Sequence, residues 1–544
     1  MHSSSDSVNG SGSGSGEGGG SLPSLSSFLA DSKAAALKHL QGEDEDGRPL
    51  VMIMGNGAGD LDSLSSAISL AYLLTNYPHS SLPFASPLPS SEARFVPLIQ
   101  TARTDTRLRP ENVAIAAAAG IRDEDVLYLS DLTDPASKSG LGLDPKEADA
   151  FSSSKNTYLG LVDHPQLELP WHGSSPRNVC ILVDHHADAG KHRDASLRVF
   201  REPEGAADGR GNPTGSAQSV IIELFKKEIK AKGMLRELSD LAMASILIDT
   251  DNLRRMPSGR ASQTDMNTME LLLPFSSFAA TSSVTGLRQA LLQHAPEEVA
   301  SSASDFSSLS VSGSQDTASK TKGIWEILAA SKNAVSHLTT LELLKRDYKT
   351  SSLSSSDIPE SIASLFPSQE LKAGFSSVNL GLPAWLHRGE DMGRESEKES
   401  RRAWDEWWKS LHQWMESQKL SVAVVGTSFS DEETQKHRRE LILAFSPPPN
   451  FPDAARFFSS VTHYLESPST SPLDLSTPWK GARLHSTGKK ERVSGLRSGL
   501  TVAVEGVPQE RIWAQVWRQQ AVKANRKVYL PTIMSALQKA AKAV

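Results

Sequence analysis

The segment of residues 181–186 constrains the fold of this chain more than any other, because an apolar run leads there into one acid and two histidines. The run begins at Cys180 and predicts a buried parallel strand. Open α/β sheets place their ligand sites at the carboxyl ends of such strands. Asp184, His185 and His186 would be costly to desolvate there without a cation among them. The segment fits a divalent metal site, and a solvated strand end would give the same pattern.

Three other apolar runs in the chain also end in an acid. Four occurrences of one pattern are hard to explain by chance, and they strengthen the prediction of a metal site at the strand ends. Two carboxylates that lie two residues apart in a tight turn can reach neighbouring points, which suits a pair of metal ions. The runs occupy residues 51–54, 158–162 and 246–248, and their acids are Asp60 with Asp62, Asp163 and Asp249.

Helical patterns alternate with these predicted strands over residues 50–250, which predicts an α/β domain with a doubly wound parallel sheet. The glycine-rich turn at residues 55–59 should offer its amide groups to an anionic ligand. Gly215 and Ser216 open another helix, where they fit either a phosphate contact or a helix cap. We predict helices at residues 25–40, 63–74, 112–119, 215–225 and 235–244, and further strands at residues 96–99 and 126–129.

The composition restricts the class of protein. The chain has 544 residues and a formal net charge of −7 at pH 7. This charge argues against a general nucleic-acid coat, but leaves room for a local basic pocket that binds a polyanion. Cys180 is the single cysteine, so we expect no disulfide framework and a reducing compartment. We find no apolar run of about 18 residues and no signal-peptide pattern, so we expect a cytoplasmic protein without a membrane segment.

We predict four consecutive parts of the chain. Residues 1–45 hold a disordered Ser- and Gly-rich tail and a leading helix, and residues 46–275 form the metal-binding domain. Residues 276–335 form a Ser-rich, partly flexible linker, and residues 336–544 form a smaller second α/β domain. Its tryptophans lie at helical spacing, which favours core packing over a ligand cage. The second domain should contain helices at residues 341–349 and around Trp404, Trp407, Trp408 and Trp414, and strands at residues 421–425 and 441–445.

Six short motifs, in chain order, resemble signatures of the DHH phosphoesterase superfamily and of its DHHA2 branch. That branch includes manganese-dependent family II inorganic pyrophosphatases, fungal-type cytosolic exopolyphosphatases and prune proteins. The resemblance implies a DHH domain and a DHHA2 domain with the active site in the cleft between them. The first-domain motifs are residues 55–63, 161–164, 183–186 and 248–250, and the second-domain motifs are residues 344–349 and 525–531.

The resemblance also implies a role for each matched residue. Asp163, His186, Arg526 and Lys527 would be catalytic, and Asp131 matches no ligand position. An Arg can fork onto phosphate oxygens, while a Lys supplies a compact positive charge. The implied metal ligands are Asp60, Asp62, Asp163, His185 and Asp249; the implied substrate contacts are Asn56, His186, Lys349, Arg526 and Lys527; and Asp251 and His164 are expected to be neighbours of the site.

Asn56 is the main departure from the pyrophosphatase pattern, which has a metal-binding histidine at this position. An amide oxygen is a harder ligand than an imidazole, so we expect two divalent ions, with Mg²⁺ favoured over Mn²⁺ or Co²⁺. Exopolyphosphatases and prune-like members resemble this chain in carrying Asn there. Animal prune sequences have Arg where this chain keeps His186. The expected activity is therefore removal of terminal phosphate from inorganic polyphosphate.

In the expected mechanism, a water that bridges the two ions attacks the terminal phosphorus, and second-domain cations orient the substrate. Closure of the domains across residues 276–335 would exclude bulk water. The same motifs also fit a prune-like phosphodiesterase or short-chain polyphosphatase, and an inorganic pyrophosphatase. A catalytically weak scaffold protein is the alternative from a different class. The expected partner is polyphosphate or another short phosphoanhydride, with no nucleic acid and no membrane.

Overall fold

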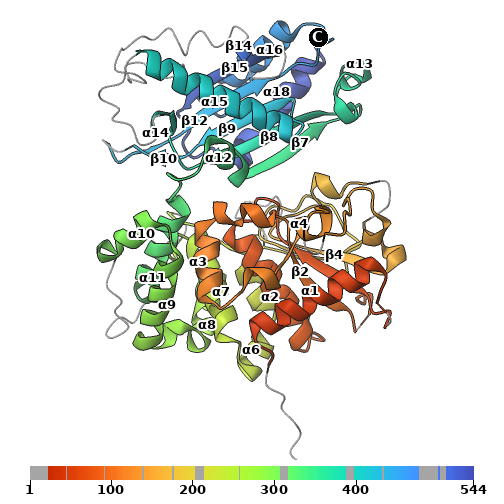
Figure 1. Ribbon diagram of the computed structural model, residues 1–544, viewed down its shortest axis with the longest axis vertical. Helices are drawn as coiled ribbons and strands as arrows, with labels where there is room; N and C mark the ends of the chain where they lie inside the picture. The colour runs from red at the N-terminus through yellow and green to blue at the C-terminus, as the bar shows by residue number, and fades with distance from the viewer. Residues whose placement is uncertain are drawn as a thin grey trace, which may run out of the picture.

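The computed structural model shows two lobes stacked along the long axis of the molecule (Figure 1). The first lobe is built from the chain up to α11, and the second begins at α12. The predicted tail of residues 1–24 lies almost wholly outside the described residues. The structure describes residues 22–544 except 45, 91, 138–139, 174–176, 202–212, 256–257, 307–316, 387–396, 432–433, 477–499 and 503–509.

A six-stranded sheet forms the centre of the first lobe, and every neighbouring pair of its strands is parallel. The order β3-β2-β1-β4-β5-β6 confirms the predicted doubly wound sheet. The strand order reverses between β1 and β4, and the carboxyl ends at such a point form a crevice for ligands. The strands are β1 (Leu50–Met54), β2 (Arg94–Ile99), β3 (Leu127–Tyr128), β4 (Thr157–Val162), β5 (Val179–Asp184) and β6 (Leu197–Phe200).

Helices cover both faces of this sheet, because successive residues of its strands point to opposite sides. In β1, Val51 and Ile53 enter one core, while Met52 and Met54 enter the other. The helices predicted at residues 25–40, 63–74, 112–119 and 215–225 are present. The structure has α1 (Leu25–Gln41), α2 (Leu61–Asn76), α3 (Pro110–Ala118), α4 (Leu129–Thr133), α5 (Ala217–Leu224), α6 (Lys226–Lys232), α7 (Arg236–Asp249) and α8 (Gln263–Leu272).

The strand predicted at residues 246–248 is wrong, because these residues form the last turn of α7. Residues 238–247 of this helix are all buried. A helix that is buried all round loses the polar stripe that reveals a helical period, so its end reads as a continuous apolar run. Asp249 therefore reaches the site from the end of a helix rather than from a strand.

The segment predicted as a Ser-rich linker, residues 276–335, contains three α-helices in its described part, residues 276–306 and 317–335, and they pack on the first lobe. Val284, Leu291 and Ile324 are fully buried in the core of that lobe. The many serines concealed these apolar positions, which recur at helical spacing. The helices are α9 (Thr281–His294), α10 (Glu297–Ser301) and α11 (Thr317–Asn333).

A mixed sheet of seven strands forms the second lobe. Its path is β13-β15-β12-β9-β8-β7, with β14 paired to β15. Only β8 and β9 run parallel among the described pairs, and the other pairs are antiparallel. The strands are β7 (Tyr348–Leu353), β8 (Leu371–Val378), β9 (Val422–Thr427), β12 (Glu440–Phe445), β13 (Leu475–Ser476), β14 (Leu500–Val502) and β15 (Glu510–Gln519), beside a separate pair β10 (Phe429–Ser430) and β11 (His437–Arg438).

Two helical layers enclose this second sheet. The four predicted core tryptophans of α15 are buried, which confirms core packing. The helix predicted at residues 341–349 ends at Arg346, because Asp347 leaves the helical conformation and β7 begins at Tyr348. The helices are α12 (Thr340–Arg346), α13 (Glu360–Ala363), α14 (Leu382–Leu386), α15 (Glu397–Ser417), α16 (Ala454–Glu466) and α18 (Arg526–Ala541).

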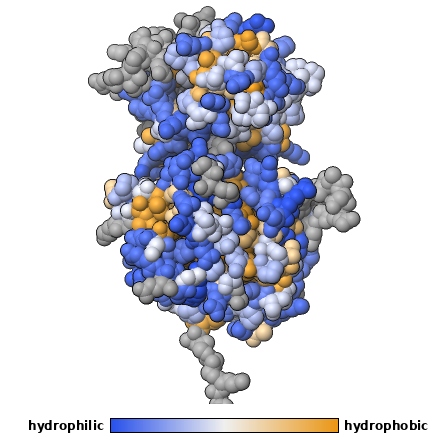
Figure 2. All heavy atoms as spheres, turned by 90° about the vertical axis from the view of Figure 1, so that its right-hand side faces the viewer, coloured by the Kyte–Doolittle hydropathy of each residue, from blue (hydrophilic) through white to orange (hydrophobic). Residues whose placement is uncertain are grey.

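The surface is hydrophilic on both lobes at the waist where they meet (Figure 2). Within the described part of the chain, every helix is too short or too polar to cross a bilayer. Cys180 is buried in β5 and has no disulfide partner, as the single cysteine of the chain requires.

Candidate active site

A cavity of about 430 Å³ lies between the lobes, at the carboxyl ends of β1, β4 and β5. Carboxylates and imidazoles of the first lobe line one wall, and cations of the second lobe line much of the other. The structure brings nine of the ten predicted site residues to this cavity, and the tenth, Asp62, lies behind His185. The nine are Asn56, Asp60, Asp163, His185, His186, Asp249, Lys349, Arg526 and Lys527.

Asp60 is positioned by the start of α2. It is the N-cap residue of that helix, and its Oδ1 accepts a hydrogen bond from the Ser63 amide at 3.1 Å. Burial alone would raise the pKa of Asp60, but the charge of Arg109 lowers it. Asp60 is thus held as an anion at the edge of the cavity.

Asp62 lies two residues further along, in the first turn of α2, and is almost fully buried. Its carboxylate accepts hydrogen bonds from Ser216 Oγ at 2.7 Å and from the amides of Ala217 and Gln218 at 2.7 and 3.1 Å. These donors form the N-terminus of α5, which favours a negative charge. Ser216 is also the N-cap of α5, so the helix start beside Gly215 holds a carboxylate of the chain itself.

Asp163 follows β4 with φ of 60°, in the left-handed region that a non-glycine residue seldom adopts. Ser63 Oγ and Asn56 Nδ2 donate to its Oδ2 at 2.7 and 2.9 Å. The Asn56 Oδ1 accepts from the Ala58 amide at 3.0 Å. The amide oxygen expected to harden the metal site is therefore engaged, and Asn56 acts on the site by orienting Asp163.

His185 faces the acids through one defined nitrogen. Its Nδ1 lies 2.9 Å from the carbonyl oxygen of Thr214, so Nδ1 carries the proton. Its Nε2 lies 3.3 Å from Asp163 and 3.9 Å from Asp62. A histidine fixed in this way by a backbone carbonyl presents the Nε2 lone pair to a metal ion.

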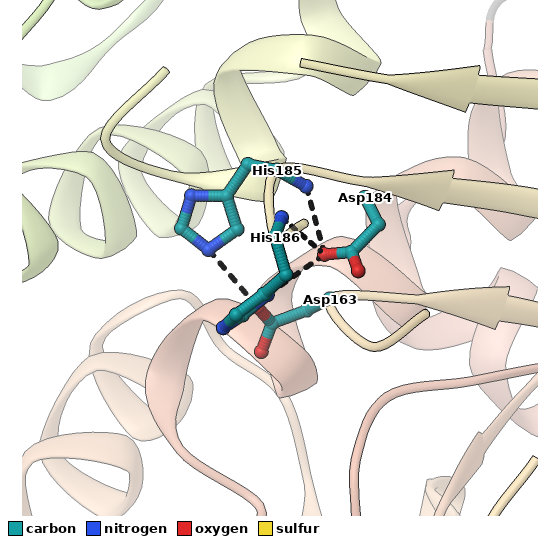
Figure 3. A group of neighbouring side chains, drawn as sticks. All are labelled: Asp163, Asp184, His185 and His186. Atoms are coloured by element: carbon teal, nitrogen blue, oxygen red, sulfur yellow. Dashed lines mark hydrogen bonds and ion pairs between the residues drawn. The ribbon is translucent and has the colours of Figure 1, made fainter. Parts of the chain in front are cut away.

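His186 and Asp184 lie beside Asp163 and His185 (Figure 3). The Asp184 Oδ1 accepts from the amides of His185 and His186 at 2.7 and 3.1 Å, and it lies 2.9 Å from His186 Nδ1. Burial lowers the pKa of His186 to about 4, so the ring is neutral near pH 7. With Nδ1 bonded to Asp184, Nε2 is the nitrogen left for a ligand in the cavity.

The donor set fits divalent metal ions. One ligand atom each from Asp62, His185 and Asp249 lie within 4.8 Å of one another, and so do those of a second group that contains Asp163, Asp184, His185 and His186. Burial raises the pKa of Asp163 and of Asp249 to about 7, and neighbouring carboxylates add to both shifts. Buried acids that oppose one another's ionisation are relieved by a bound cation, and mixed carboxylate and imidazole donors suit Mg²⁺, Mn²⁺ or Zn²⁺.

The second lobe contributes the opposite charge. Arg526 and Lys527 are the first residues of α18, behind the N-cap Asn525, and Lys349 lies on β7. Among the described residues, the ammonium groups of Lys349 and Lys527 form no ion pair. Two free cations beside a helix N-terminus make a favourable place for phosphate oxygens.

Arg526 is held by Asp347, which sequence analysis did not single out. The Arg526 Nη2 donates to Asp347 Oδ1 at 2.8 Å, and Nη1 donates to the Asp347 carbonyl at 3.0 Å. Burial would raise the pKa of Asp347, but Arg526 and Arg109 hold it well below its usual range. The sequence did contain a signal for Asp347. It is an acid that directly follows the basic end of α12 and lies two residues before Lys349.

Arg109 joins the two lobes beneath this pair. Its Nη2 donates to the carbonyl oxygens of Ala58 in the first lobe and Arg346 in the second, at 2.7 and 3.0 Å. Arg346 returns the contact by donating to the Leu108 carbonyl at 2.6 Å. The glycine-rich turn is therefore tied directly to the second lobe.

Two further cations of the cavity, Arg260 and Lys332, were also missed. They lie in the loop after α7 and near the end of α11, and neither position shows a local pattern. The proximity of Lys332 to the acids follows from the packing of the helices in residues 276–335, whereas Arg260 lies in the loop that joins α7 to α8. Asp251 and His164 are neighbours as expected: Asp251 pairs with Arg254 at 2.8 Å, and His164 bonds the Val162 carbonyl.

The amides of the glycine-rich turn differ from the prediction. Gly57 N–H donates to Glu168 Oε2 at 2.9 Å, and Ala58 N–H is taken by Asn56. These donors are satisfied by side chains of the chain, so anion binding falls to the second lobe instead.

Two known domains match the chain, one for most of each lobe. Residues 50–246 match the DHH family, N-terminal domain, and residues 326–536 match the DHHA2 domain. The class is thus a two-domain protein with a doubly wound acidic domain facing a cationic mixed-sheet domain. The chain belongs to the DHH superfamily, in its DHHA2 branch.

The individual relatives of this chain share only a low sequence identity with it. A Schizosaccharomyces pombe protein named "Putative exopolyphosphatase" is 25% identical over 232 residues, which are 41% of this chain and 50% of that protein. The exopolyphosphatase PRUNE1 of Mus musculus is 29% identical over 366 residues, 67% of this chain and 58% of that protein. This chain therefore spans half to three fifths of the length of these relatives. The crystal structure of a Methanococcus jannaschii "putative family II inorganic pyrophosphatase" covers 90% of this chain and 99% of its own, at 14% identity and a TM-score of 0.40.

Proposed function

We propose that this chain is a metal-dependent exopolyphosphatase that hydrolyses the terminal phosphoanhydride bond of inorganic polyphosphate. The observation that carries the proposal is a single cavity with acids and imidazoles on one wall and cations on the other. Phosphoryl transfer depends on positioning and on neutralisation of charge, which these two walls would supply. The names of the S. pombe and mouse relatives support the same substrate.

Two divalent ions would be held by the first lobe, with Mg²⁺ favoured and Mn²⁺ or Co²⁺ as alternatives. Four carboxylates and one imidazole make an oxygen-rich donor set, which supports a hard ion. Bound ions would activate a water as nucleophile and neutralise charge on the phosphoryl oxygens. The proposed ligands are Asp60, Asp62, Asp163, His185 and Asp249.

The protein's own groups complete the proposed site. The lone pair of His186 Nε2 would accept a hydrogen bond from a water or from a protonated phosphate, because Asp184 fixes the proton on Nδ1. Arg526, oriented by Asp347, would hold one substrate phosphate in place. Asn56 would keep Asp163 in position, since it donates to that carboxylate.

The number of cations on the cavity supports a polymer over pyrophosphate as the preferred substrate. Lys349 and Lys527 would bind phosphates beside the terminal one, and Arg260 and Lys332 add two positive charges on the same cavity. A polyphosphate carries about one negative charge on each internal phosphate, so further cations gain further contacts as the chain lengthens. Pyrophosphate offers only two phosphate groups to the same cations.

The test is phosphate release by the full chain from long polyphosphate, tripolyphosphate and pyrophosphate, each in Mg²⁺ and in Mn²⁺. We expect the highest kcat/KM with long polyphosphate. A preference for pyrophosphate would reassign the protein as a pyrophosphatase. Cleavage of a phosphodiester alone would indicate the prune-like alternative, and no turnover of any substrate would favour a scaffold.

A further inference from the structure

One buried arginine, Arg109, lies at the junction of the two lobes and contacts both of them. It is the N-cap residue of α3 in the first lobe, and its guanidinium reaches the end of α12 in the second. A single nitrogen, Nη2, donates to the Ala58 carbonyl at 2.7 Å and to the Arg346 carbonyl at 3.0 Å. The two lobes are therefore bridged by one atom at this point.

On the first-lobe side, this contact holds the turn that leads to a proposed metal ligand. Ala58 lies two residues before Asp60, and both line the active-site cavity. The next carbonyl, of Gly59, accepts a hydrogen bond from Asn112 Nδ2 at 2.9 Å. Gly59 has φ of 58°, a conformation that glycine adopts without strain and that turns the chain toward α2. Arg109 and Asn112, both at the start of α3, thus fix the backbone directly before Asp60.

On the second-lobe side, the contact holds the residue before Asp347. Arg346 Nε donates in return to the Leu108 carbonyl at 2.6 Å, so the two backbones are held from both directions. Asp347 orients Arg526, and its Oδ1 also lies 3.9 Å from Arg109 Nη2. Arg109 therefore contacts both the backbone before Asp347 and the carboxylate itself.

Glu111 allows the two arginines to remain buried side by side. Its Oε1 lies 3.7 Å from Arg109 Nη1, and its Oε2 lies 3.5 Å from Arg346 Nη2. Buried cations need such a paired anion. The other hydrogen bonds of the Arg346 side chain go to the carbonyls of Leu108 and Lys332, outside the glycine-rich turn. Arg346 thus joins the lobes without contacting the turn, whereas Arg109 does both.

We propose that Arg109 is a positioning residue, which sets Asp60 of the first wall at a fixed distance from Asp347 and Arg526 of the second. The proposal rests on the proposed function, because it assumes that Asp60 binds metal and that Arg526 binds phosphate. A misplacement of about 1 Å between reacting groups can cost about 10²-fold in rate, so the separation of these groups matters. An arginine suits this position, since the arm of a lysine is shorter by one bond and carries no planar fork of donors.

The first test is Mn²⁺ binding to the metal-free full chain, measured by isothermal titration calorimetry without substrate. Arg109→Gln should weaken Mn²⁺ binding about tenfold, which is typical when a group that orients a metal ligand is lost. Arg346→Gln is the matched control. It also takes one buried arginine away from Glu111 and should lower the melting temperature similarly, but it should leave the Mn²⁺ affinity unchanged. Unchanged affinity in the Arg109 variant, or an equal loss in both variants, would overturn the proposal.

Conservative variants separate positioning from misfolding. Arg109→Lys keeps the charge, but its shorter arm should lose one of the two carbonyls. We expect Mn²⁺ binding about fivefold weaker than in the parent, the effect of one lost hydrogen bond. If Arg109→Gln melts below the assay temperature, Arg109→Lys against Arg346→Lys makes the same comparison, and parent-like affinity in Arg109→Lys then overturns the proposal.

The connection to Arg526 is tested by a double-mutant cycle of Arg109→Gln and Asp347→Asn. The readout is the affinity for imidodiphosphate, which resists hydrolysis, in excess Mn²⁺. Each single variant should bind about fivefold more weakly and the double variant no more than about tenfold, because residues of one network are not additive. Fully additive losses would overturn the connection. A chain that shows these binding effects but releases no phosphate from polyphosphate would overturn the proposed function and leave the positioning role of Arg109 standing.

Discussion

The two walls of the active-site cavity are built in opposite ways. In the first lobe, donors of the protein fix three of the four acids. The Ser63 amide holds Asp60, and Ser63 and Asn56 hold Asp163. Five hydrogen bonds hold Asp62, from Ser66, Ser216, Ala217, Gln218 and Ser245. In the second lobe, only Arg526 is fixed, while Lys349 and Lys527 have no ion pair among the described residues. Metal binding requires fixed geometry, whereas a flexible polymer tolerates adaptable cations. This difference predicts that substitutions in the first wall lower activity far more than substitutions in the second wall.

Asp163→Ala should have the largest effect. Removal of this carboxylate should lower phosphate release by on the order of 10³-fold, because metal-assisted charge stabilisation supplies several kcal/mol. Asp251→Ala is the matched control, since Asp251 is near Asp249 but belongs to neither metal-ligand group. Undiminished release by the Asp163→Ala variant would refute the assignment of the first wall.

Arg526→Gln should rank second. Loss of the fixed guanidinium should lower kcat/KM by about 10²-fold, which is typical when one preorganised donor to a transition state is removed. Lys527→Gln should cost less, about tenfold and mainly in KM, because an adaptable ammonium binds ground and transition states alike. If Lys527→Gln proved worse than Arg526→Gln under steady-state assay, the contrast between fixed and adaptable cations would be wrong.

Asp347→Asn tests whether fixation of Arg526 matters by itself. The variant keeps the size of the side chain and removes the charge that orients the guanidinium, so we expect a loss of about 10-fold in kcat/KM. Asp347→Glu should recover part of it. Equal activity of Asp347→Asn and the wild type would show that the backbone carbonyl of residue 347 suffices to hold Arg526.

The smallest effect on turnover is expected at Asp240, which is buried in α7 away from both walls. Burial raises its pKa to about 6, despite hydrogen bonds from Ser277. Its folded-state pKa is above the unfolded value, so its contribution to stability is complete below about pH 4 and is lost as pH rises through 6. Chemical denaturation from pH 4 to 7 should show a flatter profile for Asp240→Asn, with phosphate release nearly unchanged. An unaltered pH profile would contradict the raised pKa.

The first wall could be predicted from sequence because its acids and histidines follow local patterns. Asp163 comes directly after a short apolar run, His185 follows another one residue later, and Asp60 follows a third across the glycine-rich turn; parallel strands bring such positions to one edge. Asp249 was placed correctly in the cavity although its helix was taken for a strand, since either element ends with the same residue. The order of residues along the chain was therefore sufficient to predict these positions.

The second wall and the junction between lobes were only partly predictable. Lys349, Arg526 and Lys527 belong to recognisable motifs, and Asp347 lies inside one of them, but Arg260 and Lys332 reach the cavity only through the packing of the chain. Such contacts have no period or spacing in the sequence. The helices in residues 276–335 were missed for the same reason, because serine occupies their exposed positions and masks the apolar stripe.

The backbone conformation of Asp163 relates the stability of the fold to the proposed role of this carboxylate. A φ of 60° costs backbone energy for a residue other than glycine, and the position holds an aspartate whose ionisation is opposed by burial and by neighbouring carboxylates. Both effects lower the stability of the folded state at this position. The carboxylate is placed there for the proposed chemistry and not for the stability of the fold. The Asp163→Asn variant should lose activity and should have a melting temperature no lower than that of the parent. Any rise in the melting temperature measures the stability that the fold loses by carrying the carboxylate.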